Sequence, residues 1–298
     1  MLETSDLITI VTAIIVGTIS RFLLLKEDFR QYPSYPNGYL IHLITGFIAA
    51  SLGSVAIPAL LSKNYVAVTF LVLAIQQFRD IRKMERDSLR DLEETEYTYR
   101  GAAYIDGIAK TFEVRSYYSL IVSLFTALTM HLIHFPIIPK IIIAVIVGFS
   151  ILYLLQRFSK GKTVGDIADV KVGVIEVKGS ELYVDKIFVS NLLGSDNGRE
   201  VFEKEGMAVV VYPKKDHFRI ALDHFGQRQA MLFEATRAIG LKRYNFTRKD
   251  YEKGRIVVAL VPILHDYDKL IEAVTKTPLL ESVKKSHSVM NTNLFGEE

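Results

Sequence analysis

The chain has 298 residues, half of them hydrophobic, with 36 Lys and Arg against 33 Asp and Glu and no cysteine. The lack of thiols excludes disulfides, thiolate metal sites, iron–sulfur clusters and a cysteine nucleophile. The net charge of +3 is too small to indicate a partner by itself. The length allows two domains, and the hydropathy divides the chain into an apolar first part and a second part of ordinary globular composition.

Five apolar runs in the first part are typical of transmembrane helices, because roughly 20 apolar residues cross the hydrocarbon core of a bilayer. The runs cover residues 7–25, 39–61, 65–78, 117–134 and 137–155. The third is short, and a pair of buried soluble helices is an alternative for that run alone. No basic segment and no small-residue cleavage site accompany the first run, so we expect it to be retained.

Small residues recur every four residues in two of these runs, which lets a neighbouring helix approach closely. They are Gly46, Ala50 and Ser54 with Gly53 on the adjacent row, and Ala144 with Gly148. Packing within the bundle is the favoured interpretation. Self-association of two copies is the alternative.

The number of Lys and Arg residues alternates between high and low in successive loops that connect the runs. The first loop has Arg21, Lys26 and Arg30, and the central loop 79–116 and the exit from the last run are also basic, whereas the opposite connections have only Lys63 and Lys140. Basic loops stay on the cytoplasmic side. The pattern therefore predicts a multi-pass protein of the cytoplasmic membrane, partnered by the lipid bilayer, with the N-terminus outside and the C-terminus in the cytoplasm.

Few ionisable residues fall inside the runs. Arg21 is near enough to the inner end of its run to extend to the headgroups, and His42 also lies near an inner end. His131 and His134, one turn apart, could bind a metal ion or relay protons. No acidic residue lies beside them in the sequence, so we favour histidines at the membrane surface.

The central loop, residues 79–116, begins as a charged helix and continues into a second amphipathic segment. In this second segment Ile105, Ile108, Ala109 and Phe112 fall at i, i+3, i+4 and i+7, which is one apolar stripe of a helix. The pattern predicts a helix that lies on the membrane surface.

Charged residues occupy the rest of that helix. Asp106, Lys110 and Glu113 have spacings that allow ion pairs, and Arg115 follows them. For Asp106, Glu113 and Arg115 we favour a structural role, as caps and ion pairs, over acid–base chemistry.

Residues 159–298 predict a cytoplasmic α+β domain that follows a transmembrane domain of residues 1–158. We expect strands at 170–177, 182–189, 207–212, 217–222 and 256–264, and helices at 199–205, 227–239 and 267–274. Gly240 is suited to end the second helix and Asp266 to cap the third. A ferredoxin-like arrangement is a possible topology for these elements.

The usual signatures of nucleotide binding and hydrolysis are missing. The sequence has no phosphate-binding loop, no glycine-rich dinucleotide fingerprint and no nucleophile elbow. Acidic residues nearly balance basic ones after residue 159, which argues against nucleic-acid binding. We therefore predict no catalytic residue, no metal and no cofactor.

The stretch from Tyr104 to Ala109, Tyr-Ile-Asp-Gly-Ile-Ala, is followed by Thr-Phe-Glu-Val-Arg at residues 111–115. It closely resembles the signature of the bacterial YIEGIA family of membrane proteins. Asp106 replaces the glutamate of the family name, which keeps the charge and shortens the side chain by one methylene. The motif residues Tyr104, Asp106, Gly107, Lys110, Phe112, Glu113 and Arg115 are the candidate functional residues.

The resemblance implies several membrane spans, an endospore-forming bacterium and a link to assembly of the spore envelope, and it supplies no catalytic residues. Three functions remain open. A scaffold or sensor with a cytoplasmic domain that binds a protein partner or a small ligand is favoured. The alternatives are a small oligomeric transporter or channel and a membrane enzyme that acts on envelope precursors.

Overall fold

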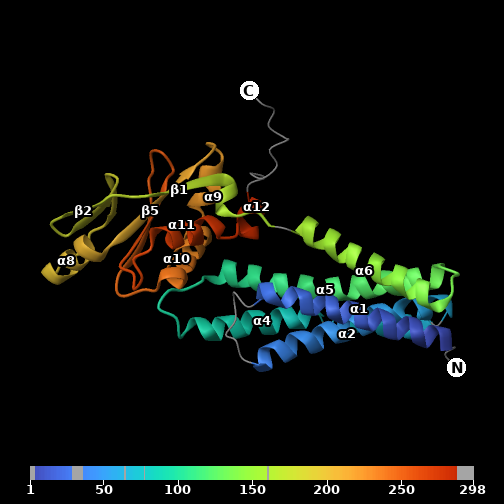
Figure 1. Cartoon of the computed structure of the whole chain (residues 1–298). Helices are drawn as coiled ribbons and strands as arrows, with labels where there is room; N and C mark the ends of the chain where they lie inside the picture. The colour runs from blue at the N-terminus through green and yellow to red at the C-terminus, as the bar shows by residue number, and fades with distance from the viewer. Residues whose placement is uncertain (1–3, 29–35, 64, 77, 160, 287–298) are drawn as a thin grey trace. The chain divides into compact units, whose positions relative to one another are not determined.

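The structure is a computed structural model that describes residues 4–28, 36–63, 65–76, 78–159 and 161–286 (Figure 1). The chain divides into two compact units. Unit 1 comprises Met1–Ser88 and Ile108–Lys160, and unit 2 comprises Leu89–Gly107 and Gly161–Glu298. A segment from the middle of the sequence therefore folds with the C-terminal part. Arg30, one of the basic residues in the predicted charge alternation, lies outside the described residues.

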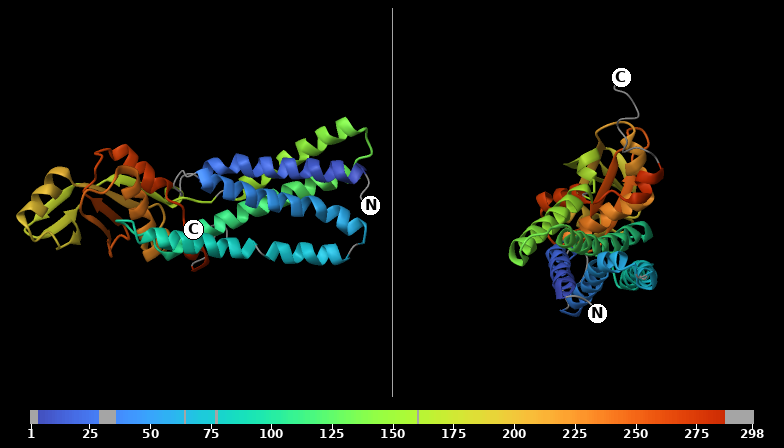
Figure 2. Two further views of the ribbon diagram at one scale, coloured as in Figure 1. Left: turned by 90° about the horizontal axis from the view of Figure 1, so that it is seen from below. Right: turned by 90° about the vertical axis from the view of Figure 1, so that its right-hand side faces the viewer.

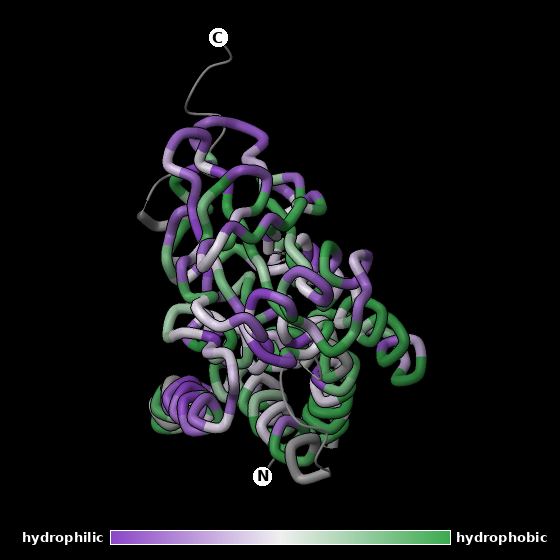
Figure 3. The backbone as a smooth tube through the Cα atoms, turned by 90° about the vertical axis from the view of Figure 1, so that its left-hand side faces the viewer, coloured by the Kyte–Doolittle hydropathy of each residue, from purple (hydrophilic) through white to green (hydrophobic). Residues whose placement is uncertain are grey.

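Unit 1 is helical. It contains α1 (Thr4–Asp28), α2 (Pro36–Leu61), α3 (Tyr65–Gln76), α6 (Ile137–Ser159), most of α4 (Phe78–Glu93) and most of α5 (Ala102–Leu132). The long helices α1, α2 and α5 run alongside one another (Figure 2). In the tube coloured by hydropathy, the coils around the label N are largely green (Figure 3).

Three helices are long and apolar enough to cross a membrane. The stretches are Ser5–Leu25, Leu40–Leu61 and Ile137–Ser159. They correspond to the first, second and fifth of the five expected spans. The third expected span forms α3, which has only 12 residues, and the fourth forms the C-terminal part of the 31-residue helix α5.

Small residues lie where the helices of unit 1 meet. The Ser119 hydroxyl of α5 donates to the carbonyl oxygens of Gly17 and Gly46, at 2.7 and 2.9 Å. A Cβ atom on Gly53 would lie 2.2 Å from the Leu120 carbonyl oxygen. The helix backbones can approach this closely only because glycine has no side chain at these positions. Helices α1, α2 and α5 therefore form a tightly packed group.

The second set of small residues, Ala144 and Gly148, lies on α6. A Cβ on Gly148 would lie 2.6 Å from Thr126 Oγ1 and 2.8 Å from Val16 Cγ1, and Ala144 is fully buried. Ala50 and Ser54 of α2 are buried as well. These residues are packed within unit 1.

Unit 2 contains two antiparallel sheets. The larger has the order β1-β5-β7-β6, from β1 (Ala168–Val172), β5 (Met207–Pro213), β7 (Ile256–Leu260) and β6 (Asn245–Lys249). The smaller is a meander of β2 (Ile175–Lys178), β3 (Glu181–Val184) and β4 (Ile187–Ser190). Residues 207–211 and all of β7 are buried, because both faces of these central strands are covered.

The helices of unit 2 include α8 (Asp196–Glu205), α10 (Phe225–Ile239) and α11 (Tyr267–Lys276), with the short α7 (Val164–Ile167), α9 (Phe218–Asp223) and α12 (Glu281–Ser286). Both predicted helix ends are confirmed. Gly240 follows α10 with a φ of 74°, and the Asp266 side chain accepts a hydrogen bond from the Lys269 amide at the start of α11.

Several strand predictions were wrong in detail. Most of the expected strand 217–222 lies in α9, which begins at Phe218, and the residues that this helix buries, Phe218, Ala221 and Leu222, have helical spacing. The runs 170–177 and 182–189 each break in two, the second at Asp185 and Lys186, which both have positive φ. Strand β6 was missed because it is polar and lies at the sheet edge.

The strands of the larger sheet follow the chain order β1, β5, β6, β7, with the smaller sheet and α8 between β1 and β5, α9 and α10 between β5 and β6, and α11 after β7. A ferredoxin-like domain has the order strand, helix, strand, strand, helix, strand. The predicted ferredoxin-like arrangement is therefore not confirmed. Unit 2 is a mixed domain of helices and antiparallel sheets.

Candidate functional site

Tyr104, the first residue of the signature, is bound inside unit 2. Gly101, whose φ of 86° suits glycine, ends the preceding loop, and its carbonyl accepts the Tyr104 amide at 3.0 Å as α5 begins. The Tyr104 hydroxyl, on a residue 3% exposed, donates to Oε1 of Glu234 on α10 at 2.5 Å. Arg237 donates to the other oxygen of Glu234 at 2.6 Å.

The electrostatics of this contact keep Tyr104 protonated. Burial raises the pKa of its phenol, and the neighbouring Glu234 carboxylate raises that pKa further. The hydroxyl therefore remains a hydrogen-bond donor at every ordinary pH, and the buried carboxylate keeps its second partner.

The strap, which we define as residues 94–101, joins α4 to α5 and is part of unit 2. Its backbone and hydroxyl groups are bound by side chains from α10 and β6. Gln229 donates to the Tyr99 carbonyl at 2.5 Å, and Asn245 donates to the Thr98 hydroxyl at 3.1 Å. The strap is therefore docked by specific polar bonds.

Arg100 secures the end of the strap. Its guanidinium donates to Glu96, four residues earlier, at 2.6 Å and lies 4.9 Å from the centre of the Phe233 ring. A cation over an aromatic face is favourable, more so when the pair is shielded from water. The Gly101 amide donates to Glu93 at 2.7 Å, which ties the strap to the end of α4.

The apolar stripe of the signature helix is buried by protein. Ile105, Ile108, Ala109 and Phe112 are each at most 3% exposed. A stripe that rests on lipid would be left uncovered by the protein, so the interpretation as a membrane-surface helix is corrected here. The residues instead belong to the first half of the continuous helix α5.

The remaining signature residues make contacts along α5. In unit 1, Phe112 stacks on His42 with 4.9 Å between ring centres. Glu113 lies 3.9 Å from Arg82 and accepts from Tyr117 at 3.5 Å. The partly buried Asp106, Gly107, Lys110 and Arg115 also interact with neighbouring groups. A Cβ on Gly107 would meet nothing within 4 Å.

The sequence suggested that Arg21 extends to the headgroups. In the structure its side chain lies inside unit 1 instead. It is 1% exposed, and a Cβ on Gly46 of α2 would lie 2.3 Å from its Cγ. Gly46 therefore makes room for the arginine stem. The charge of Glu85 on α4 acts on the guanidinium and offsets part of the cost of burying it.

The two histidines at the other end of α5 are exposed. His134 Nδ1 lies 3.1 Å from the Leu132 carbonyl. Within the described ranges, no group of three or more His, Asp or Glu is arranged to hold a metal ion.

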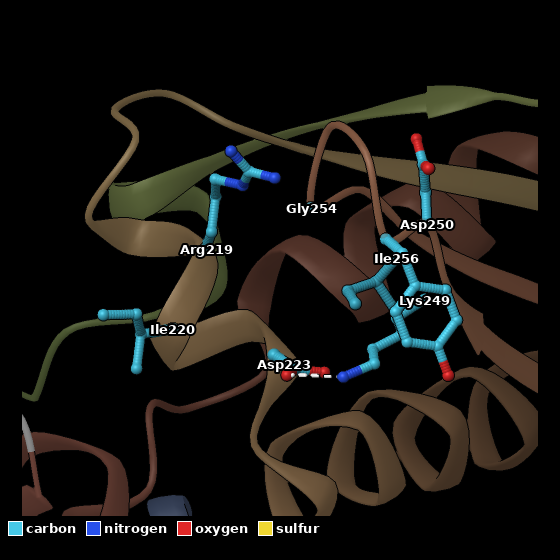
Figure 4. Close-up of a pocket in the computed structure, with 8 residues that line it drawn as sticks. Arg219, Ile220, Asp223, Lys249, Asp250, Gly254 and Ile256 are labelled. Atoms are coloured by element: carbon cyan, nitrogen blue, oxygen red, sulfur yellow. Dashed lines mark hydrogen bonds and ion pairs between the residues drawn. The ribbon is translucent and has the colours of Figure 1, made fainter.

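A cavity of about 210 Å³ opens in unit 2 between α9 and the hairpin of β6 and β7 (Figure 4). Its lining residues are Arg219, Ile220, Asp223, Lys249, Asp250, Tyr251, Gly254 and Ile256. Sequence reasoning missed it, because α9 was predicted as a strand and β6 was not recognised. The cluster of charge at residues 248–255 was the available signal.

Asp250 and Arg255 form a partly buried ion pair beside the cavity. Arg255 donates to Asp250 Oδ2 through Nε at 2.8 Å and through a second nitrogen at 2.7 Å. The Glu252 amide donates to Oδ1 at 3.0 Å. Burial opposes the charge on Asp250, but these hydrogen bonds outweigh burial and lower the pKa of the carboxyl.

We expect Asp250→Asn to destabilise unit 2 by about 1 kcal/mol at neutral pH, because it leaves the partly buried Arg255 without its counter-charge. A lowered pKa stabilises the folded state above the unfolded value of about 3.9. The difference between wild type and variant should therefore shrink as the pH falls below about 4. Thermal unfolding of the full chain in detergent, measured between pH 3 and 7, checks this; a constant difference would contradict it.

The comparisons with known proteins agree with one another. A family model described as YIEGIA protein matches residues 9–290. A Bacillus subtilis (strain 168) protein with the name Uncharacterized protein YphB is 36% identical over 281 residues, which cover 92% of each chain. No solved structure matches the chain.

Proposed function

The chain belongs to the YIEGIA family, and we propose that it is an integral membrane scaffold or sensor of the bacterial cytoplasmic membrane. In this proposal unit 1 is the membrane part, and unit 2 lies in the cytoplasm and binds a protein partner or a small ligand. The resemblance of the signature to a family linked with the spore envelope supports a role in sporulation.

The proposal rests chiefly on the continuity of α5. The helix begins at Ala102, and its first turn carries Tyr104, which bonds to Glu234 in unit 2. The same helix carries Ser119, which bonds to Gly17 and Gly46 in unit 1. Because a helix transmits displacement along its axis, this arrangement suits the coupling of a binding domain to a membrane domain.

Three spans are supported by length and composition, and we propose that α3 and the C-terminal part of α5 complete five. The short α3 can reach the headgroups through its polar neighbours, at a modest cost in mismatch. The alternation of Lys and Arg supports an external N-terminus and a cytoplasmic C-terminus.

One observation favours the alternative of a small oligomeric transporter or channel. Arg21 is a buried charge inside a candidate span, and such residues often mark substrate or ion pathways. Flux of ions or small solutes into proteoliposomes that is lost in Arg21→Gln would favour transport over a scaffold.

The absence of cysteine makes the topology directly testable. Single cysteines at Lys63 and His134 should react with a membrane-impermeant maleimide on intact cells. Cysteines at Tyr97, on the strap, and at Lys253, in unit 2, should react only after permeabilisation. Labelling of Lys253→Cys in intact cells would overturn the proposed orientation.

The scaffold or sensor role is tested by affinity capture of the tagged full chain from sporulating cells in mild detergent. We expect mass spectrometry to recover either a reproducible protein partner or a bound small molecule. Recovery of the chain with neither, at normal abundance and from cells that require it, would contradict both forms of the proposal.

A further inference from the structure

The two edges of the larger sheet in unit 2 differ in what covers them. At the β6 edge, Asn245 donates to Thr98 of the strap, and Arg248 lies 5.7 Å from the centre of the Phe188 ring of β4. At the other edge, β1 pairs with β5 alone among the described strands. An edge strand with unpaired backbone groups is a template for a further strand. We infer that β1 pairs with β1 of a second copy of this chain, across a two-fold axis.

Strand β1 is open to solvent along most of its length. Only Ala168 is buried, whereas residues 169–172 are all at least partly exposed, and Val172 is 47% exposed. In the central strand β7 of the same sheet every residue is buried. A partner strand at the β1 edge would therefore remove apolar surface from water, which is favourable.

The backbone of β1 presents alternate residues to its free side. The Gly173 amide donates to the Ala208 carbonyl at 2.9 Å, and the Lys214 amide donates to the Ile167 carbonyl at 2.9 Å. Both bonds follow the β1–β5 register, so the N–H and C=O groups of odd-numbered residues in β1 face β5. Those of Val170 therefore face outward, as do those of residue 172. They can bond to another strand without breaking a bond of the sheet.

The charges of β1 select one register for two copies. In an antiparallel pair centred on Val170, Asp169 of each copy lies opposite Lys171 of the other, which is a favourable cross-strand pair. This register also places Val172 opposite Ala168, so outward-facing backbone groups meet. A pair centred on Asp169 or on Lys171 would instead place two like charges opposite each other, which is unfavourable.

Both charged side chains are accessible for such a pair. The Asp169 side chain is 61% exposed and lies 3.8 Å from Lys214, at the outer limit of an ion pair. Lys171 is exposed and lies 5.5 Å from the centre of the Tyr212 ring. Tyr212 is the β5 residue opposite Asp169. The acid and the base therefore lie on the same face of β1, where a second copy can meet both.

Strand β2 has the same order of charges and provides the comparison. Glu176 and Lys178 flank Val177, as Asp169 and Lys171 flank Val170. In β2, however, the two charges pair with each other at 3.1 Å, and α8 packs beside the strand. Because β2 already compensates its charges within the chain, we expect no pairing of two copies there.

The test is disulfide cross-linking of single cysteines in membranes that contain the full chain, which has no cysteine of its own. The two-fold axis places only Val170 opposite the same residue, with Cα atoms about 5.5 Å apart, inside the range for a disulfide. Two copies of Asp169, or of Lys171, would be about 8 Å apart, from two rises of about 3.4 Å and a strand spacing of about 4.8 Å. That distance is too long for a disulfide.

With copper phenanthroline as the oxidant, Val170→Cys should form a dimer at least tenfold faster than Asp169→Cys, Lys171→Cys or Val177→Cys. Co-expression of Asp169→Cys with Lys171→Cys should give the dimer that neither forms alone. Val174→Cys controls for random collision, because Val174 is 65% exposed and lies four residues from the axis. Equal cross-linking at 170 and 174, or the fastest at 169 or 171, would overturn the register. No dimer with Val170→Cys would overturn the inference and leave this edge to a peptide of another protein.

Charge reversal in the Val170→Cys background tests what selects the register. Asp169→Lys should slow the cross-linking at least fivefold, because lysines then face each other across the pair. Adding Lys171→Asp should restore the rate, since each reversed charge again faces its opposite. Glu176→Lys on β2 is the matched control and should leave the rate unchanged. A double variant as slow as Asp169→Lys alone would overturn the charge pairing.

The inference goes beyond the proposed function and does not depend on it. Two copies in one membrane carry β1 on the same side, whichever side that is. Cross-linking through Val170→Cys with external labelling of Lys253→Cys would reject the proposed orientation and leave the pairing of two copies standing. Labelling as expected without cross-linking would reject the pairing and leave the membrane proposal standing.

Discussion

Gly53→Ala should destabilise unit 1 by about 3 kcal/mol, at the upper end of the usual cost of overpacking. The added Cβ would lie 2.2 Å from both the Leu120 carbonyl oxygen and the Ser123 hydroxyl oxygen of α5. A side-chain hydroxyl can rotate away, but a helix carbonyl cannot. Helices α2 and α5 must therefore separate to make room. The measurement is the temperature at which detergent-solubilised protein loses its monodisperse size-exclusion peak.

Gly107→Ala is the matched control, since it makes the same chemical change in the same protein. A Cβ on Gly107 meets nothing within 4 Å, and the residue lies inside α5. Alanine is favoured over glycine in a helix interior by up to about 1 kcal/mol. Gly107→Ala should therefore be neutral or slightly stabilising. If the two variants lost stability equally, close packing at Gly53 could not be the reason.

The helices of unit 1 were predictable because their signal is long and simple. A run such as 39–61 is apolar over its whole length, and its small residues indicate close packing without reference to any partner. The burial of Arg21 had no such signal. It depends on the space left by Gly46 and on the charge of Glu85, which come from two other helices.

The short elements of unit 2 were harder to predict from the sequence. Residues 217–222 are too few to separate a helical from a strand periodicity, and tertiary packing of Phe218 and Leu222 selects the helix. Strand β6 has neither alternation nor an apolar run, because it pairs on one side only. The cavity lies between these two elements and was missed for the same reason.

The signature was found from the sequence, but its contacts were not. Tyr104 belongs to a recognisable motif, whereas its partner Glu234 is 130 residues away in a helix with no distinguishing pattern. The stripe at Ile105, Ile108, Ala109 and Phe112 was read correctly as one apolar face. A periodic pattern shows that a face is covered and does not show whether lipid or protein covers it.

Tyr104→Phe should release the strap from α10. The variant removes one hydrogen bond to a charged acceptor, which contributes about 1.5–3 kcal/mol, and leaves the buried Glu234 with Arg237 as its partner in that cluster. Hydrogen–deuterium exchange should show the amides of residues 98–105 exchanging about tenfold to hundredfold faster. The Gly101 amide, bonded to Glu93, and the Tyr104 amide, bonded to Gly101, are the sensitive positions.

Tyr97→Phe is the control, because Tyr97 lies on the same strap and is 93% exposed. Equal protection in the two variants would show that the Tyr104 hydroxyl does not hold the strap. The pH dependence gives a second test. A raised pKa means that the hydroxyl stabilises docking fully below the unfolded tyrosine value of about 10 and loses that effect as the pH rises. The difference in thermal stability between wild type and Tyr104→Phe should therefore stay constant from about pH 7 to 9 and shrink above about pH 10.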